Sequence, residues 1–270
     1  MDEPLVGAEI ERRLDSRIVG RALEVHPVID STNARAVALA RAGAPEGLVV
    51  VAEEQTAGRG RLGRRWHAPA GGALLVSLLF RPSLKPAQAQ RVTMVCSLAA
   101  VAAVEEVCGL RARIKWPNDV VLADAKIGGL LTELGVSAGV LAFVVVGIGL
   151  NVNMDVATLP DLVTPATSLS SELGRPVSRR DLLVAFLRRA DDLYGRLRGG
   201  WSPREAWRDA LATLGRQVTV ATPEETIHGV AEDVDDDGAL LVRTENGTLR
   251  RTLAGDVTLR GRHPGGAGGA

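Results

Sequence analysis

The stretch "VLAFVVVGIGLNVN", residues 140–153, is the most apolar part of the chain and decides which kind of fold it can form. Its apolar run is far shorter than the roughly 20 residues that a membrane-spanning helix needs. A short run rich in valine instead predicts a buried strand. Late in this strand, Gly147 and Gly149 remove side-chain bulk, and Asn151 and Asn153 follow as neutral hydrogen-bonding groups. An ordinary strand-to-loop turn is the alternative interpretation of these four residues.

Further strand and helix patterns surround this stretch. Strand-like runs occur at residues 48–55, 73–80, 112–122 and 127–135. Helical patterns occur at residues 30–43, 86–107, 178–200 and 202–215, with a short helix and a strand within residues 8–25. We therefore predict an α/β (α+β) fold in which helices cover a mixed sheet.

The pattern changes after Gly215, where short strands are separated by the turns "DDDG" and "ENG". Such short strands and tight turns are typical of a small β-barrel of about 50 residues. We predict a first domain at residues 1–214, the barrel at residues 215–262 and a flexible tail at residues 263–270.

The composition indicates a globular protein without an overall electrostatic field. The chain has 270 residues, 46% of them hydrophobic, and 32 basic residues against 32 acidic ones. Its acidic opening lacks the apolar run of a signal peptide. The two cysteines, Cys96 and Cys108, fit neither a disulfide framework nor a metal-ligand pattern. We therefore expect a cytoplasmic protein without a membrane association, in which any anion site is local.

The loop "QTAGRGRLGRRW", residues 55–66, contains four arginines and three glycines. It lies in an interval, residues 55–104, that has seven cationic side chains and no carboxylate. Guanidinium groups bind carboxylates and phosphates through paired donors, and glycines let backbone N–H groups approach the same oxygens. The loop therefore favours an anionic ligand, although a solvated arginine-rich turn would also explain it.

Two other nucleotide motifs are excluded for this loop. Its glycines match G-x-G-x-x-G, but a dinucleotide-binding fingerprint also needs a helix start and an acidic residue about 20 positions later. Neither follows here, because the chain continues into "WHAPAGG" and the next acidic residue is Glu105. A phosphate-binding P-loop fails as well, since Arg64 and Arg65 stand where lysine and serine or threonine belong.

A second cluster occupies the stretch "RIKWPNDVVLADAKIGGLLTE", residues 113–133. Only three basic residues of the chain are lysines, and Lys115 and Lys126 both lie here. The turn "WPND" displays Asn118 at the end of a strand, and the pair Gly128 and Gly129 lets a ligand lie against a strand backbone. Each lysine alone would be explained by a surface position, but their coincidence with the glycines favours a binding site.

Together the clusters predict a ligand with a carboxylate, one or more phosphates and a neutral, amide-like face. Ser31, Thr32, Asn33 and Gln55 offer hydrogen-bonding groups for the neutral face. No Ser-His-Asp arrangement and no Cys/His metal spacing occurs in the sequence. Catalysis would therefore depend on positioning and on cations that stabilise developing charge.

With these residues in place, the chain strongly resembles the biotin protein ligases. The resemblance is carried, in the family's order, by "DSTN", "QTAGRGRLGRRW", "KWPNDV", "KIGGLLTE" and "GIGLNVN", and it extends from Ser31 to about residue 262. It implies a catalytic domain akin to class II aminoacyl-tRNA synthetases, followed by an SH3-like barrel. It also implies that the enzyme uses biotin, ATP and Mg²⁺ to form biotinyl-5′-adenylate and then transfers biotin to a lysine of a biotin carboxyl carrier domain.

The resemblance and the two clusters together assign expected roles to individual residues. Biotin contacts are expected for Ser31, Thr32, Asn33, Gln55, Arg59, Gly60, Arg61, Lys126, Gly128 and Gly129. Contacts with ATP or the adenylate are expected for Arg61, Arg64, Trp66, Lys115, Asn118, Lys126 and Asn151. Lys126 and Arg61 are the expected catalytic residues, with Lys126 bridging the biotin carboxylate and the α-phosphate. No residue is assigned to the metal.

Some members of this family carry an N-terminal winged helix and repress biotin synthesis. The residues ahead of Ser31 are too few for a DNA-reading module, which needs roughly 50 or more residues. We therefore expect a monofunctional ligase that binds no specific DNA and is a monomer or a weak homodimer.

Two other functions remain alternatives at this point. A lipoate-protein ligase shares the implied fold and reaction type, although the complete Gly-Arg loop followed by "KWPND" favours biotin. An RNA-binding module would also use an Arg-Gly loop, but the neutral net charge and only 3% aromatic residues argue against base stacking.

Overall fold

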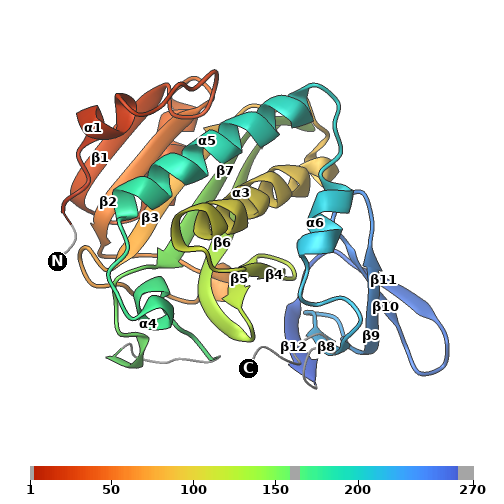
Figure 1. The fold of residues 1–270 in the computed structure, drawn as a ribbon. Helices are drawn as coiled ribbons and strands as arrows, with labels where there is room; N and C mark the ends of the chain where they lie inside the picture. The colour runs from red at the N-terminus through yellow and green to blue at the C-terminus, as the bar shows by residue number, and fades with distance from the viewer. Residues whose placement is uncertain (1–2, 159–164, 261–270) are drawn as a thin grey trace.

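A seven-stranded mixed sheet forms the centre of the larger part of the molecule (Figure 1). The computed structural model describes residues 3–158 and 165–260. The strand order is β1-β2-β3-β7-β6-β5-β4, with β1 and β2 parallel and all other neighbours antiparallel. The strands are β1 (Ala22–Ile29), β2 (Leu48–Gln55), β3 (Ala73–Phe80), β4 (Arg113–Lys115), β5 (Asp119–Leu122), β6 (Ala125–Ser137) and β7 (Val140–Asn151).

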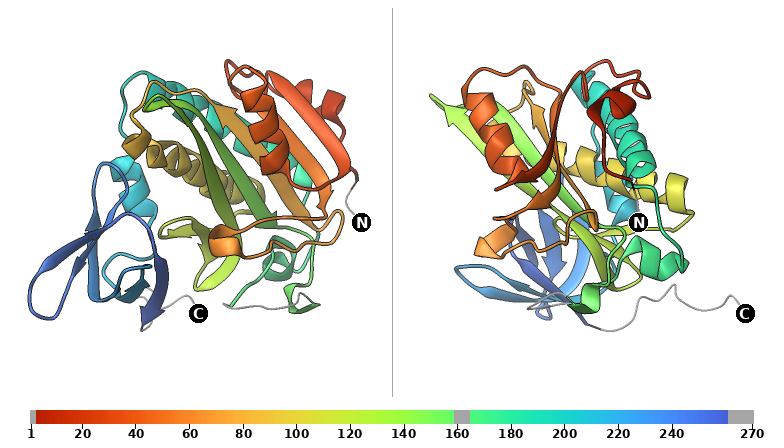
Figure 2. Two further views of the ribbon diagram at one scale, coloured as in Figure 1. Left: turned by 180° about the vertical axis from the view of Figure 1, so that it is seen from behind. Right: turned by 90° about the vertical axis from the view of Figure 1, so that its left-hand side faces the viewer.

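Helices cover both faces of this sheet. The long helices α3 (Gln90–Cys108) and α5 (Arg179–Arg198) cross one face, and α2 (Thr32–Arg41) lies on the other face, which Figure 2 shows from behind. The shorter helices are α1 (Gly7–Glu11), α4 (Leu169–Leu173) and α6 (Arg204–Ala210), with 3₁₀ turns η1 (Arg61–Gly63), η2 (Pro86–Gln88) and η3 (Val156–Thr158). This arrangement confirms the predicted mixed sheet layered with helices.

Strand β7 is buried on both faces, as its sequence predicts. Val144 and Val146 belong to the core under α3 and α5, whereas Phe143 and Val145 pack in the core under α2. Alternate side chains of one strand point to opposite faces, so a strand between two helical layers needs apolar residues at nearly every position. The stretch from Val140 onward therefore forms the middle of the sheet.

Helix α2 begins with a side-chain cap at Ser31. The Ser31 side chain accepts a hydrogen bond from the backbone N–H of Ala34, which satisfies one of the unpaired donors of the first turn. Gly43 follows the helix with a positive φ of 90°, a conformation that glycine adopts without steric cost. This start places Asn33 over a face of the sheet, where it bonds to Ser77 of β3 and Leu131 of β6.

A second, five-stranded antiparallel sheet follows from Gln217, with the order β11-β10-β9-β8-β12. Its strands are β8 (Gln217–Ala221), β9 (Thr226–Val234), β10 (Leu240–Arg243), β11 (Leu249–Thr252) and β12 (Asp256–Arg260). It confirms the small antiparallel β domain predicted after the helices. The predicted tail, residues 263–270, lies outside the described residues.

The two sheets are joined through a common hydrophobic core. Trp116 and Trp207 of the larger part pack in one cluster with Val220 and Leu240 of the second sheet. The indole Nε1 of Trp116 also donates a 2.8 Å hydrogen bond to the carbonyl of Gly238. Because buried aromatic side chains contribute large apolar contact areas, this junction fixes the small domain against the larger one.

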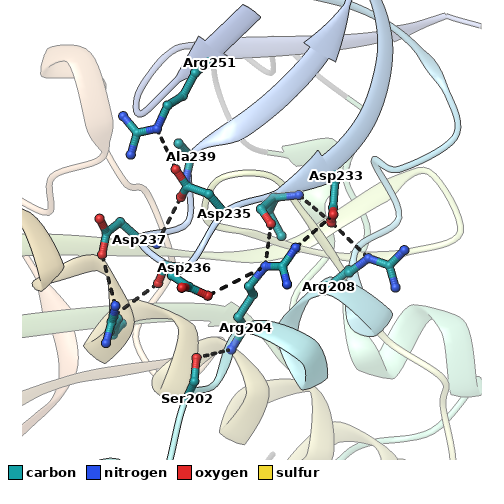
Figure 3. A network of polar contacts seen from close by, with 11 residues as sticks. Ser202, Arg204, Arg208, Asp233, Asp235, Asp236, Asp237, Ala239 and Arg251 are labelled. Atoms are coloured by element: carbon teal, nitrogen blue, oxygen red, sulfur yellow. Dashed lines mark hydrogen bonds and ion pairs between the residues drawn. The ribbon is translucent and has the colours of Figure 1, made fainter. Parts of the chain in front are cut away.

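Arginine–aspartate pairs reinforce the junction at its surface (Figure 3). Arg204 and Arg208 of α6 both bond to Asp233 at 2.9 Å. In the neighbouring turn, Asp235 accepts backbone N–H groups and the Arg251 side chain. This cluster of aspartates is therefore neutralised by arginines, and no group of acidic, His or Cys residues suited to a metal occurs within the described ranges.

One predicted helix boundary is wrong. The pattern of residues 202–215 predicts a helix up to Gly215, but α6 ends at Ala210. Strand β4 interrupts it, because the N–H of Ala212 donates to Ile114 and the hydroxyl of Thr213 accepts from the N–H of Trp116. These contacts with a distant strand replace the hydrogen bonds that another helical turn would have made.

Among the helices that the structure describes, none has both the length and the apolar character needed to cross a bilayer.

Candidate active site

A cavity of about 650 Å³ lies where the sheet, the arginine-rich loop and the small domain meet. Its walls come from the start of α2, the loop after β2, strands β4 to β7 and the last strand, β12. The structure brings fourteen of the predicted site residues to this cavity, namely Ser31, Thr32, Asn33, Gln55, Arg59, Gly60, Arg61, Arg64, Trp66, Lys115, Asn118, Lys126, Gly129 and Asn151.

Gly128 is the predicted site residue that the structure does not bring to the cavity. A Cβ added at Gly128 would lie 2.4 Å from the Leu150 side chain and 2.6 Å from the Gly149 carbonyl oxygen. The glycine therefore permits close packing of β6 on β7. Its neighbour Gly129, which points to the other face of the strand, lines the cavity instead.

One end of the cavity consists of uncharged hydrogen-bonding groups around Gln55. The Gln55 Oε1 accepts from the Thr32 backbone N–H at 2.7 Å and lies 3.0 Å from the Thr32 hydroxyl. These two contacts fix the orientation of the amide, which leaves Nε2 as the donor that Gln55 can offer elsewhere. Ser31 and Thr32 are each only 4% exposed, so this end is held inside the fold.

Asn33 connects this end to the sheet beneath it. Its Oδ1 lies 2.6 Å from the Ser77 hydroxyl, and its Nδ2 donates to the Leu131 carbonyl at 3.2 Å. The side chain occupies space over Gly147, because a Cβ there would lie 2.0 Å from Asn33 Oδ1. The lack of a side chain at Gly147, which the sequence indicates, therefore makes room for Asn33. We call the group Ser31, Thr32, Asn33 and Gln55 the neutral end.

The arginine-rich loop forms a small hairpin over the cavity. Arg59 and Arg65 make an isolated antiparallel bridge, and the N–H of Gly60 donates to the Arg64 carbonyl at 2.6 Å. The N–H of Trp66 donates to Gly58, where an added Cβ would lie 2.6 Å from the Trp66 carbonyl oxygen. At this point the hairpin requires a glycine for close backbone approach.

Arg61 and Arg64 of the loop both reach acceptors in the small domain. Arg61 donates to Asn118 Oδ1 at 2.8 Å and to the Gly255 carbonyl at 3.1 Å, and Arg64 forms an ion pair with Asp256. Burial lowers the pKa of Arg61, an effect that the nearby carboxylates partly offset. A guanidinium group is not deprotonated in proteins, so Arg61 remains a cation. The loop thus joins both domains across the cavity.

The two site lysines flank one carboxylate. Lys126 Nζ lies 2.6 Å from Asp119 Oδ1 and 5.9 Å from the centre of the Trp66 ring. Burial lowers the pKa of Lys115, and the charge of Asp119 opposes that change. The turn before Asp119 contains a cis peptide bond between Trp116 and Pro117. We call the group Arg61, Arg64, Lys115 and Lys126 the cationic end.

Trp66 and Asn151 lie between the two ends. The Trp66 ring fills the space over Gly149, where an added Cβ would lie 2.5 Å from the indole. Its Nε1 is buried and has no acceptor within the described part of the protein. A buried donor of this kind costs free energy unless a ligand or water accepts from it. Asn151 donates to the Thr167 carbonyl at 3.0 Å and is 5% exposed.

The acid-free interval contributes fewer cations to the site than its sequence suggests. Arg81 donates instead to the carbonyls of Ala40, Ala44 and Ala142, and Arg91 pairs with Asp237 at 3.3 Å. Composition alone cannot distinguish an arginine that donates to backbone carbonyls from an arginine that binds a ligand. The cations that line the cavity are therefore arginines of the loop, the two lysines and the buried Arg216.

Several residues that line the cavity or bond to its walls have no role that the sequence motifs predict. Asp256 to Leu259 of β12 line the cavity, although more than a hundred positions separate them from the motifs. Glu133, which bonds to Arg59 and Asn33, follows the glycine pair on β6. Asp119 is visible in "WPND", but its pairing with Lys126 depends on the register of β5 and β6.

Comparisons with known proteins define the class to which this fold and site belong. Residues 25–151 match the Biotin/lipoate A/B protein ligase family, and residues 213–260 match the Biotin protein ligase C terminal domain. The biotin–[acetyl-CoA-carboxylase] ligase of Mycobacterium tuberculosis is 34% identical over 263 residues, which cover 92% of this chain and 94% of that protein. The bifunctional ligase/repressor BirA of Bacillus subtilis is 34% identical over 258 residues, which cover 93% of this chain and 78% of the relative.

Solved structures agree with these relatives. The biotin protein ligase from Aquifex aeolicus in complex with biotin and ATP superposes with a TM-score of 0.75 and 30% sequence identity. The matched region covers 89% of this chain and 99% of that one. The chain belongs to the biotin protein ligase family.

Proposed function

We propose that this protein is a biotin–[acetyl-CoA-carboxylase] ligase, which joins biotin and ATP into biotinyl-5′-adenylate and transfers biotin to a lysine of a carrier domain. The observation that carries the proposal is a cavity of about 650 Å³ in which a neutral end meets a cationic end. Biotin has an uncharged bicyclic ring at one end and a carboxylate at the other. Its two ends therefore match the two ends of the cavity.

The neutral end suits the ring of biotin. Gln55 has its Oε1 engaged by Thr32, so its Nε2 is the group that can donate to a carbonyl oxygen of the ring. The hydroxyl groups of Ser31 and Thr32 both donate and accept. Asn33 lines the same end, but its amide bonds to Ser77 and Leu131, so we assign it to shaping this end.

The cationic end suits the reacting groups. In the first step a biotin carboxylate oxygen attacks the α-phosphorus of ATP, the new P–O bond forms and pyrophosphate leaves. Two anions must meet in this step, and a compact ammonium such as that of Lys126 lowers their repulsion. Arg61 and Arg64 would hold the phosphate oxygens, exchanging their present acceptors for the ligand. Trp66 Nε1 offers a further donor beside them.

The second step transfers the biotinyl group. The amine of the carrier lysine attacks the acyl carbon of the mixed anhydride, an amide bond forms, and AMP leaves with the bonding electron pair while the amine loses a proton. The loop hairpin over the cavity would limit the access of water, which otherwise hydrolyses the anhydride. A biotin carboxyl carrier domain is the partner that we propose.

Mg²⁺ enters this proposal as part of the substrate MgATP. The described residues contain no group of three or more His, Cys, Asp or Glu side chains suited to a metal. Mg²⁺ in such enzymes is bound mainly by substrate phosphates and water, with one or two carboxylates. Three carboxylates at the cavity could supply the one or two that are needed, namely Asp119, Asp124 and Asp256.

Several broader expectations remain part of the proposal. We propose a cytoplasmic, monomeric or weakly dimeric ligase with its catalytic domain at residues 1–214 and its small domain at residues 215–262. We also propose that these residues bind no specific DNA, since residues 3–31 form one five-residue helix and one strand. A protected site on biotin-operon promoters in footprinting at physiological salt would contradict the last point.

Mass spectrometry tests the proposed function directly. The protein is incubated with MgATP and a carrier domain, together with biotin in one arm and lipoate in the other. We expect the mass of one biotinyl group to appear on one carrier lysine, with no comparable gain from lipoate. Modification by lipoate alone would assign the protein to the other branch of its family, and no modification in either arm would contradict the proposal.

A further inference from the structure

Glu133, the last residue of the motif "KIGGLLTE", connects the neutral end to the loop and has no role among the expected site residues. It lies on β6, and its Oε1 accepts from Asn33 Nδ2 and from Arg59 Nη2, both at 3.2 Å. Its side chain is 30% exposed, and that of Arg59 is 51% exposed. One carboxylate oxygen therefore links a buried residue of the neutral end to an exposed residue of the loop.

The partners of the loop arginines divide them into two groups. Arg61 reaches Asn118 in the turn before β5 and Gly255 in the small domain. Arg64 reaches Asp256, which is also in the small domain. Arg59 turns to the opposite side and meets Glu133. The hairpin is thus attached at both sides of the cavity, and Glu133 is the attachment at the neutral end.

The position of Glu133 gives its carboxylate two consequences. Its charge offsets that of Arg59, so the neutral end keeps its uncharged character although a guanidinium lies beside it. The Asn33 bond in turn holds the carboxylate beside the neutral end, since Asn33 is itself fixed by Ser77 and fills the space over Gly147. Glu133 therefore fixes the position of the loop relative to the buried sheet.

On the basis of the proposed function, we infer that Glu133 is a positioning residue that latches Arg59 and so retains biotinyl-adenylate in the cavity between the two steps. It does not touch the reacting atoms. Its effect is on how long the loop stays over the anhydride, because release of the intermediate requires the Arg59–Glu133 pair to separate. An exposed ion pair of this kind contributes modestly, so the effect is measurable but small.

The test measures release of the intermediate. The enzyme makes labelled biotinyl-adenylate from biotin and α-labelled ATP, is chased with unlabelled biotinyl-adenylate, and the bound label is followed in time. Glu133→Gln keeps an oxygen acceptor for Asn33 but removes the charge. We expect about threefold to fivefold faster release from this variant, a change typical of an exposed pair. Glu232→Gln, which removes a carboxylate paired with Arg243 in the small domain, is the matched control.

A double-mutant cycle separates the latch from a general structural role. In an Arg59→Met background, the Glu133→Gln substitution should leave the release rate unchanged, because the partner of the latch is already missing. Equal release from wild type and Glu133→Gln would overturn the inference, as would a Glu133→Gln effect of full size in the Arg59→Met background.

Trypsin provides a readout that does not depend on catalysis. Cleavage after the loop arginines requires an extended, accessible backbone, so Glu133→Gln should be cut faster there than wild type and the Glu232→Gln control. Equal cutting rates would contradict the latch. If wild type forms no labelled adenylate, the proposed function fails at the loading step, before any difference between the variants is measured.

Discussion

The two ends of the cavity are built in different ways. The neutral end is made by regular elements, and Ser31, Thr32 and Asn33 are each 4% exposed. Thr32 bonds to Gln55 and to the buried Ser77, and Asn33 bonds to Ser77. The cationic end combines two arginines of the loop with Lys115 of β4 and Lys126 of β6. Its Arg64 side chain is 51% exposed and pairs with Asp256 of the second domain. A rigid end can select a ligand by shape, whereas the charges of the other end are balanced by acceptors that a ligand can replace.

This difference predicts that substitutions at the two ends have separable effects. Changes at the neutral end should affect biotin binding and the stability of the fold together, because the same buried bonds serve both. Changes at Arg64 of the cationic end should affect catalysis while leaving stability nearly unaltered, because its ion pair with Asp256 is exposed and such pairs contribute little to folding.

The largest effect is expected for Lys126→Ala. Loss of the ammonium removes about 2 to 4 kcal/mol of transition-state stabilisation, the range for comparable electrostatic groups, which corresponds to roughly 30-fold to 1,000-fold in rate. Biotin-dependent exchange of pyrophosphate into ATP measures this step, and thermal unfolding checks that the fold is retained. Lys126→Arg should rescue poorly, since a planar fork cannot replace a compact ammonium. Lys85→Ala, at an exposed site, serves as the control, and normal exchange by Lys126→Ala would remove this lysine from the reaction.

Gly147→Ala should cause the next largest change, at the neutral end. The added methyl group would overlap Asn33, so we expect the unfolding free energy to fall by about 1 to 3 kcal/mol. The Michaelis constant for biotin should rise several-fold, while that for ATP stays near its original value. Gly195→Ala in α5, where no atom lies within 4 Å of the added methyl, is the matched control and should be neutral or stabilising. Unchanged biotin binding in Gly147→Ala would show that the neutral end is not where the ring binds.

Ser77→Ala tests whether the neutral end depends on its buried support. The Ser77 hydroxyl bonds to Thr32 and Asn33 from β3, so its loss leaves a buried acceptor unsatisfied at a cost of about 1 to 3 kcal/mol. We expect weaker biotin binding by calorimetry and an unchanged affinity for ATP. Equal losses for both ligands would contradict the division of the cavity into two ends.

Asp256→Asn should give the smallest effect. It removes the charge that Arg64 meets in the small domain, where an exposed pair is worth about 1 kcal/mol or less. We expect a change of about fivefold or less in the Michaelis constant for ATP, larger at low salt because the pair is then less screened. Glu225→Gln, which removes the partner of Arg250 in the same domain, is the control. An effect on biotin binding without an effect on ATP binding would contradict the placement of Asp256 beside the cationic end.

The parts of the fold that the sequence predicts are those set by local patterns. The apolar run of β7 and the turn-rich small domain both appear where the patterns place them. The end of α6 could not be predicted, because strand β4 interrupts that helix through Thr213 and a neighbouring peptide group. The helix propensity of residues 202–215 contains no information about hydrogen bonds to a strand that is distant in the sequence.

The same distinction applies to the site. Motif residues such as Gln55 and Lys126 come together because each motif lies at the end of a strand in one sheet. The sequence could not show that Gly129 faces the cavity whereas Gly128 faces the other side of the sheet, because the direction of each residue depends on how β6 pairs with its neighbouring strands. The contributions of Asp256 and Glu133 arise from domain packing and strand register, which no short motif encodes.

A crystal structure of the protein with bound biotinyl-5′-adenylate is the measurement that tests the two-ended cavity most directly. The account predicts that the bicyclic ring lies against Gln55 and Thr32, and that the phosphate lies within hydrogen-bond distance of Lys126 and a loop arginine. The Arg64–Asp256 pair should then be opened or shared with the phosphate. A ligand bound in the reverse direction, or a phosphate placed away from Lys126, would contradict the account.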